Sequence, residues 1–105
     1  MTPLKTPENK EITYLEADIN YTIFHMNDGK KIISSFTLKK YETDSRLAGF
    51  LRVHKSFLLN PDFIKHYEQR GKKATVHLST GKVLVVSRRR MVRIKNQITL
   101  KMKQL

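Results

Sequence analysis

A short segment places several hydrogen-bonding side chains inside an otherwise apolar run. The segment FLRVHKSFLLN, residues 50–60, carries Arg52, His54, Lys55 and Ser56 among large apolar residues. A strand that ends at the edge of a protein can bury its first residues and expose its last ones, so we expect these polar groups near an exposed tip. There the ammonium group of Lys55 could donate to guanine O6 and N7, or it could simply be solvated. Arg52 could hold the backbone of an adjacent loop or contact a phosphate.

The other polar residues of this segment also have two readings each. His54 could donate to a phosphate, but its apolar neighbours favour a buried role in which it bonds a nearby carbonyl and fixes the turn. Ser56 could contact a phosphate, although its side chain is better suited to turn hydrogen bonds. Asn60 precedes Pro61, and we expect it to fix the exit of the connection.

A second polar segment is Ser87-Arg88-Arg89-Arg90, which follows a predicted strand and opens a predicted helix. Ser87 is a typical N-cap residue, and free N–H groups at a helix N-terminus bind phosphates. Guanidinium groups donate to phosphate and to guanine. The segment is therefore expected to contact nucleic acid, unless it is only the solvated start of a basic helix.

A third group of candidates lies in other connections. Asn20 precedes a predicted strand, and its amide could bond adenine N6 and N7, although Asn also serves in loops that need an unusual φ. Tyr21 could stack on a sugar or reach a phosphate. The lysines that could equally be solvated or contact phosphate are Lys72, Lys73 and Lys82.

The pattern of apolar residues predicts a mainly β fold that positions these side chains. β-Branched and aromatic residues occur in short runs, and Asp28-Gly29 and Thr80-Gly81 are typical of hairpin turns. Residues 55–61 are predicted to be a tight connection. The predicted strands cover residues 12–17, 21–26, 31–35, 50–54, 63–69, 74–79 and 82–86.

Two helices complete the predicted fold. Residues 37–47 form a short internal helix, and residues 88–103 form a basic amphipathic helix at the C-terminus. The inner face of the first helix is predicted to contain Leu38, Tyr41 and Leu47. The apolar stripe of the second helix is predicted to pack on the sheets and to contain Met91, Ile94, Ile98, Met102 and Leu105.

The length and charge of the chain limit its possible domain organisation and binding partners. The chain has 105 residues, so residues 1–9 are expected to be a flexible arm and residues 10–105 a single domain. The net charge is +12 at pH 7, and no acidic residue follows Glu68, whereas eleven Lys and Arg residues do. Such a one-sided positive field attracts polyanions, nucleic acid first and an anionic membrane surface second.

The absence of cysteine excludes disulfides and thiolate zinc sites. It is typical of a reducing compartment, and we expect a cytoplasmic protein. The opening MTPLKTPENK lacks the apolar core of a secretory signal, and no apolar run approaches the roughly 20 residues of a membrane span. No cofactor, metal or membrane partner is expected.

Three stretches match a known family in order and spacing. They are LEADINYTIFHMNDG, FLRVHKSFLLNPDFI and HLSTGKVLVVSRRR. The second contains the block F-x-R-x-H-[KR]-S-[FY]-x-x-N with an Ile four residues later, and the third ends its hairpin with V-S-R. Together they resemble the LytTR DNA-binding domain of bacterial response regulators, and the resemblance covers roughly residues 10–95.

The resemblance implies an elongated stack of small antiparallel sheets that binds double-stranded DNA through loops between strands. Loop side chains would enter successive major grooves, and two protomers would bind direct repeats near promoters and bend the DNA. At the matched positions, Lys55 and either Arg88 or Arg89 would contact bases. At the position of Arg90 the family more usually has a small or polar residue, so this sequence departs from the family pattern there. A receiver domain or another regulator would be an additional partner.

The residues and the resemblance together predict a sequence-specific DNA-binding domain for transcription regulation in a bacterial two-component system. The predicted base contacts are Asn20, Lys55, Arg88 and Arg89. The predicted contacts with the DNA backbone are Tyr21, Arg52, His54, Ser56, Lys72, Lys73, Ser87 and Arg90.

Other function classes fit the sequence less well. The four histidines lack metal-ligand spacing such as HExxH, and no Ser-His-Asp arrangement or phosphate-binding Gly loop is recognisable, which argues against an enzyme. No aromatic residue follows Tyr67 in the basic part of the chain, which argues against base stacking on RNA. RNA binding stays an alternative, as does a free-standing module that binds and antagonises another regulator.

Overall fold

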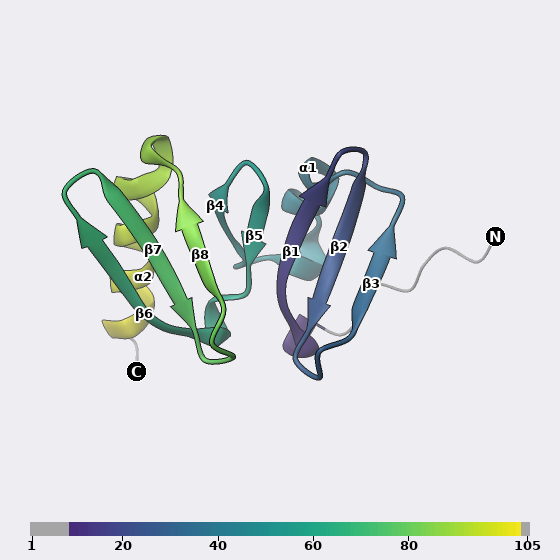
Figure 1. The fold of residues 1–105 in the computed structure, drawn as a ribbon, viewed down its shortest axis with the longest axis horizontal. Coiled ribbons are helices and arrows are strands. Elements are labelled where there is room, and N and C mark those ends of the chain that lie inside the picture. The colour runs from purple at the N-terminus through teal and green to yellow at the C-terminus, as the bar shows by residue number, and fades with distance from the viewer. Residues whose placement is uncertain (1–8, 104–105) are drawn as a thin grey trace.

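The structure is a computed structural model that describes the backbone of residues 9–103 and the side chains of residues 10–100. Two antiparallel sheets lie side by side along the long axis, with a helix behind each of them (Figure 1). The arm predicted over residues 1–9 lies outside the described residues, apart from Asn9. This residue begins a short 3-10 helix, η1 (Asn9–Glu11).

The first sheet has five strands in the order β3-β2-β1-β5-β4. The predicted strands 12–17, 21–26, 31–35 and 50–54 correspond to β1, β2, β3 and β4. The bounds of the five strands are β1 (Ile12–Asp18), β2 (Tyr21–Met26), β3 (Lys31–Ser34), β4 (Leu51–His54) and β5 (Phe57–Leu59).

β5 corrects the prediction that residues 55–61 form only a connection. The strand has three residues, which is too short for a period-two pattern to show in the sequence. Asn60 ends it as predicted: the buried side chain donates to the Ile12 carbonyl at 2.8 Å and accepts the Asp62 N–H at 3.0 Å. A 3-10 turn, η3 (Pro61–Phe63), then leads to the second sheet.

The second sheet has three strands, β6 (Ile64–Arg70), β7 (Lys73–Leu78) and β8 (Val83–Val86), in that order. Alternate residues of β7 are buried as predicted, namely Ala74, Val76 and Leu78. They share a hydrophobic cluster with the predicted stripe of α2 (Met91–Lys103), namely Met91, Ile94 and Ile98. Met102 and Leu105, also predicted for that stripe, lie outside the described side chains.

The helix predicted over residues 37–47 is wrong in its extent. It divides into α1 (Leu38–Glu42) and a 3-10 turn, η2 (Ser45–Leu47). The break falls at Asp44, whose side chain accepts the backbone N–H of Arg46 at 2.9 Å. Asp side chains compete in this way with helical hydrogen bonds. The predicted inner face is nevertheless buried.

The C-terminal helix differs from the prediction at its start. A 3-10 turn, η4 (Arg88–Arg90), precedes the α-helix, which begins at Met91. Ser87 has the extended backbone of an N-cap, but its side chain makes no capping hydrogen bond, so that part of the prediction is wrong. Its backbone N–H instead donates to the Val53 carbonyl at 2.9 Å, and this tertiary contact sets the orientation of the residue.

The molecule measures 46 × 28 × 24 Å along its principal axes. This elongated shape, the two antiparallel sheets, the short internal helix and the C-terminal helix confirm the predicted fold class. Val53 and Leu59 of the first sheet belong to the same buried cluster as Val76 of the second sheet and Ile94 of α2. Burial of this shared apolar surface therefore fixes the position of one sheet relative to the other.

Candidate nucleic-acid interface

Four connections lie along one long edge of the molecule, which we call the upper edge (Figure 1). They are the β1–β2 turn (residues 19–20), the β4–β5 turn (55–56), the β6–β7 turn (71–72) and the β8–α2 connection (87–90). The upper edge contains all residues predicted to contact bases, namely Asn20, Lys55, Arg88 and Arg89. Because the molecule is 46 Å long and successive major grooves lie about 34 Å apart, the edge can span two of them.

The β1–β2 turn presents exposed side chains from a two-residue tip. Asp18 and Tyr21 pair across the turn, so Ile19 and Asn20 form its tip, and both are exposed. Ile19 has φ +55°, which is strained for a β-branched residue, and it is 90% exposed. Tyr21 is 53% exposed. Ile19 was not among the predicted contacts, although an Ile at a hairpin tip, where Gly or Asn is usual, was a readable signal.

Arg52 braces the β4–β5 turn. Its Nε donates to the His54 carbonyl at 2.9 Å, and one terminal nitrogen donates to the Lys55 carbonyl. The other terminal nitrogen forms an ion pair with the carboxylate of Glu42. The Arg52 side chain is only 16% exposed, whereas Lys55 is exposed at the tip. Of the two roles considered for Arg52, the structure shows the first, and contact with phosphate stays a prediction.

His54 fixes the same turn. Its Nδ1 accepts the backbone N–H of Ser56 at 3.1 Å, so the ring accepts from an N–H instead of bonding a carbonyl, as was expected. Burial lowers the pKa of His54, and the nearby charge of Lys55 lowers it further. The ring is therefore neutral near pH 7, as a hydrogen-bond acceptor must be. The Ser56 carbonyl accepts the Ala17 N–H at 2.9 Å, which joins the turn to β1.

The β8–α2 connection adds the densest positive charge. Arg88 and Arg89 are exposed and Arg90 is half-buried. The hydrogen bond from Ser87 to Val53 holds this connection beside β4, although the two segments are distant in sequence. The Ser87 hydroxyl is buried and has no hydrogen-bond partner among the described residues.

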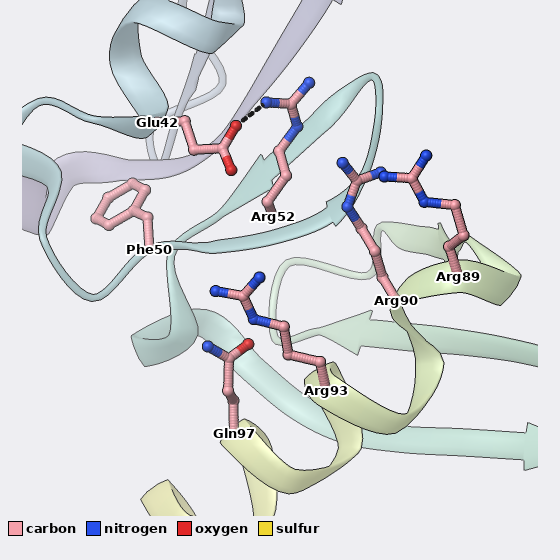
Figure 2. A pocket seen from close by; sticks show the side chains of 7 residues that line it. All are labelled: Glu42, Phe50, Arg52, Arg89, Arg90, Arg93 and Gln97. Carbon is pink, nitrogen blue, oxygen red and sulfur yellow. Dashed lines mark hydrogen bonds and ion pairs between the residues drawn. The ribbon is translucent and has the colours of Figure 1, made fainter.

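A hollow of about 310 Å³ is lined by residues of β4 and of the start of α2, and we call it the arginine hollow (Figure 2). Four guanidinium groups and one carboxylate surround it, which leaves a local excess of positive charge. Burial and the neighbouring Arg52 and Arg89 lower the pKa of Arg90. Such a cluster favours an anion with several oxygen atoms, such as a phosphate. The lining residues are Glu42, Phe50, Arg52, Arg89, Arg90, Arg93 and Gln97.

The lysines of the second sheet lie at two different edges. Lys72, in the β6–β7 turn, and Lys73, the first residue of β7, are exposed at the upper edge. Lys82 is also exposed, but it lies in the β7–β8 turn at the opposite edge (Figure 1). The structure thus groups Lys72 and Lys73 with the predicted base contacts and separates Lys82 from them.

Known proteins share this architecture. The family model described as the LytTr DNA-binding domain matches residues 6–99. Among solved structures, the chain is similar to a LytTr DNA-binding domain from Bacillus cereus, whose parent protein is described as a methyl-accepting/DNA response regulator. The TM-score is 0.73 at 20% sequence identity, and the match covers 90% of this chain and 93% of that chain. No curated protein gives a significant match.

No helix in the described part of the chain is long and apolar enough to cross a membrane.

Proposed function

Because the chain belongs to the LytTR DNA-binding domain family, we propose that its upper edge binds double-stranded DNA in a sequence-specific manner. The observation that carries this proposal is that four connections, drawn from both sheets, present exposed polar or cationic side chains on one edge. Cationic side chains neutralise phosphates, and a hairpin tip can enter a major groove that is about 12 Å wide.

Three positions on the upper edge are assigned to base readout. The amide of Asn20 bonds adenine N6 and N7, the ammonium group of Lys55 donates to guanine O6 and N7, and an arginine of the β8–α2 connection donates to a second guanine. That arginine is Arg88 or Arg89. Because the β1–β2 turn and the β8–α2 connection belong to different sheets, their side chains enter successive major grooves of one duplex.

The DNA backbone between these grooves faces the arginine hollow and its neighbours. Phosphate contacts fix register and orientation on the duplex, while base contacts select the sequence. Arg52 and His54 have a second task here, because they hold the turn that presents Lys55. The assigned backbone contacts are Tyr21, Arg52, His54, Ser56, Lys72, Lys73 and Arg90. Ser87 was also predicted, but its hydroxyl is buried and its N–H bonds Val53, so its part is to hold the connection in place.

The regulatory context is part of the proposal and is supported by the resemblance to response-regulator output domains. The protein acts in transcription regulation as the output domain of a bacterial two-component system, in the cytoplasm. Two protomers bind direct repeats side by side, and the contacts in two grooves favour a bent duplex. A receiver domain or another regulator controls this DNA binding.

The salt dependence of binding tests the proposal, with a fluorescently labelled duplex and anisotropy as the readout. If about six to ten phosphates are neutralised, log K falls against log salt concentration with a slope of about −5 to −9. Removing one phosphate contact, as in Lys72→Ala, should make the slope less negative by about 1, whereas Lys82→Ala should leave it unchanged. A slope near zero for the wild type would end the proposal, and stronger binding to an RNA duplex or single strand would favour the RNA alternative.

A further inference from the structure

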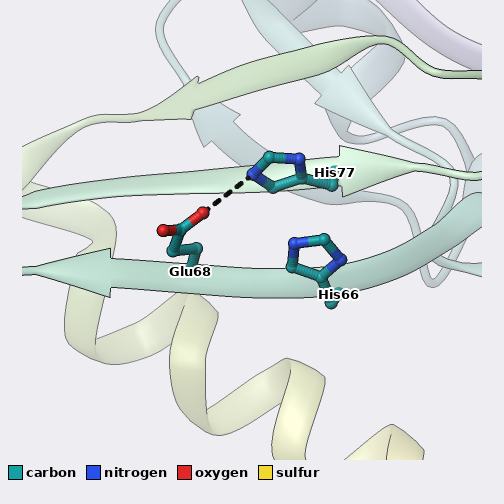
Figure 3. A group of neighbouring side chains, drawn as sticks. All are labelled: His66, Glu68 and His77. Atoms are coloured by element: carbon teal, nitrogen blue, oxygen red, sulfur yellow. Dashed lines mark ion pairs between the residues drawn. The ribbon is translucent and has the colours of Figure 1, made fainter.

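The outer face of the second sheet carries a group of side chains that DNA binding does not use. His66 and Glu68 of β6 and His77 of β7 point to the same side of the sheet (Figure 3). We propose that these three residues bind a divalent transition-metal ion that prefers nitrogen ligands, such as Zn²⁺. The proposal does not depend on DNA binding, because the site lies in the middle of the strands and not at the upper edge.

A β-bulge in β6 brings the two imidazoles together. Ile64 pairs with Leu78, but the next pair is His66 with His77, so Lys65 is an extra residue in β6. Without the bulge, His66 would lie opposite Val76, a core residue. β-Bulges re-aim side chains in this way and are common beside functional sites.

The side chains after the bulge confirm this change of face. Tyr67 packs against the hydrophobic cluster, as Ile64 does, although the two residues are three positions apart. Successive side chains of a strand point to opposite faces. Because Tyr67 faces the core, its neighbours His66 and Glu68 lie on the outer face. His77 lies across from them on β7, on the face opposite to Val76 and Leu78.

The possible ligand atoms lie close enough together that side-chain rotations would bring them within bonding distance of one metal ion. The possible ligand atoms of the three residues lie within 4.8 Å of one another. The rings of His66 and His77 are stacked, with centroids 4.1 Å apart and an angle of 15° between their planes. Glu68 Oε2 lies 3.3 Å from His77 Nε2. Zinc bonds of about 2.0–2.1 Å place tetrahedral ligands about 3.4 Å apart, so rotation of the exposed His66 ring completes the set.

A neighbouring side chain orients the carboxylate ligand. Arg70 Nε donates to Glu68 Oε1 at 2.8 Å, which holds the carboxylate and leaves Oε2 turned to His77. A partner of this kind fixes the direction of a metal ligand in known sites, and its loss typically weakens metal binding about 10–100-fold. The Thr75 hydroxyl lies 3.3 Å from His77 Nε2, so an ion bound at that nitrogen would replace this contact.

The donor set selects the kind of ion. Two imidazoles and one carboxylate are a known ligand set for zinc with an open fourth position, whereas Mg²⁺ and Ca²⁺ prefer oxygen ligands. The bound ion would join β6 to β7 and keep a water molecule on its exposed side. The sequence did not indicate this site, because the ligands come from two strands and the bulge, not a motif, aligns them.

Calorimetric titration of tag-free, chelator-treated protein with ZnCl₂ tests the proposal. We expect one Zn²⁺ per chain, reversal by EDTA, and no comparable heat with MgCl₂. His66→Gln and His77→Gln should each weaken zinc binding at least about 10-fold, since losing a ligand should cost no less than losing a supporting partner. Both variants should keep the far-ultraviolet circular dichroism spectrum and the DNA affinity of the wild type.

His25→Gln is the matched control. His25 Nε2 lies 2.8 Å from Glu16 Oε1, so it is also an imidazole beside a carboxylate, but its ring stacks on Tyr14 and not on a second histidine. This variant should keep the wild-type zinc affinity. In the wild type, ring NMR signals of His66 and His77 should shift on zinc addition, and those of His25 should not. Equal zinc affinity of the wild type and the double variant His66→Gln/His77→Gln, or shifts spread over all histidines, would overturn the proposal.

Discussion

Two turns of the upper edge present their side chains in opposite ways. In the β4–β5 turn, Arg52 and His54 hold the backbone with hydrogen bonds to residues 54–56, and Lys55 projects from that support. In the β1–β2 turn, the tip is closed by the backbone pairing of Asp18 with Tyr21, and Ile19 at the tip is strained.

The difference suggests two ways to prepare a surface for DNA. A braced turn loses little conformational freedom on binding, so more of the contact energy appears as affinity. A strained, exposed residue costs the free protein stability, and such strain is concentrated at functional positions. The β4–β5 turn therefore depends on its internal bonds, whereas in the β1–β2 turn stability and function should oppose each other.

Breaking the brace should have the largest effect. Arg52→Met keeps the apolar stem but removes the bonds to Glu42 and to two carbonyls, so the free energy of unfolding should fall by about 2–3 kcal/mol. DNA affinity should fall too, since the Lys55 turn loses its support. Urea unfolding and anisotropy measure the two effects. Arg46→Met, which removes an exposed ion pair with Asp44, is the control and should change both far less. Loss of affinity without loss of stability would make Arg52 a phosphate contact instead of a brace.

Removing the side chain that the brace presents should come next. Lys55→Ala should cost about 1–3 kcal/mol in DNA binding and relax the preference at one base pair, with stability unchanged. Lys82→Ala is the matched control, because Lys82 is also exposed in a hairpin turn but at the opposite edge. Equal losses on a selected duplex and on random DNA would reduce Lys55 to a phosphate contact.

Relieving the strain in the β1–β2 turn should raise the stability of the protein instead of lowering it. Ile19→Gly permits the positive φ and should raise the free energy of unfolding by about 1 kcal/mol, the strain removed less the extra backbone entropy of glycine. Ile33→Gly, at another exposed isoleucine within β3, should instead destabilise the protein. If Ile19→Gly were also destabilising in urea unfolding, the turn would not be strained, and the contrast with the β4–β5 turn would be lost.

Lowering the pH should loosen the β4–β5 turn but not the β1–β2 turn, and this effect should be smaller than the three above. The pKa of His54 is lowered in the folded protein, so its contribution to stability is complete above the unfolded value of about 6.5 and is lost as pH falls below it. Protonation puts a hydrogen on Nδ1 and removes the acceptor for the Ser56 N–H. Exchange of the Ser56 amide, corrected for the intrinsic rate, should therefore accelerate below about pH 6.5, while that of Tyr21 should not. Unchanged protection of Ser56 would mean that the ring does not fix the turn.

The sequence predicted what depends on local pattern. The alternation in β7 and the helical spacing of Met91, Ile94 and Ile98 correctly predicted which residues pack in the core. The three-residue strand β5 was missed because it carries too little pattern, and the break at Asp44 depends on one side-chain hydrogen bond.

The remaining features could not be predicted from the sequence because they depend on tertiary contacts. The candidate contacts were found from residue type and resemblance, but their support was not. The ion pair of Arg52 with Glu42 joins residues ten positions apart, and the bond from Ser87 to Val53 joins the residue that follows β8 to β4. Neither contact leaves a periodic signal in the chain.

Selection of bound duplexes from a random pool tests most directly whether the upper edge reads two successive major grooves. We expect enriched sequences with two short conserved blocks whose centres lie about 10–10.5 base pairs apart, one helical turn, for each bound protomer. Asn20→Ala should erase preference in one block, and the double variant Arg88→Ala/Arg89→Ala should erase it in the other. A single block that both variants weaken alike, or no enrichment at all, would contradict the account.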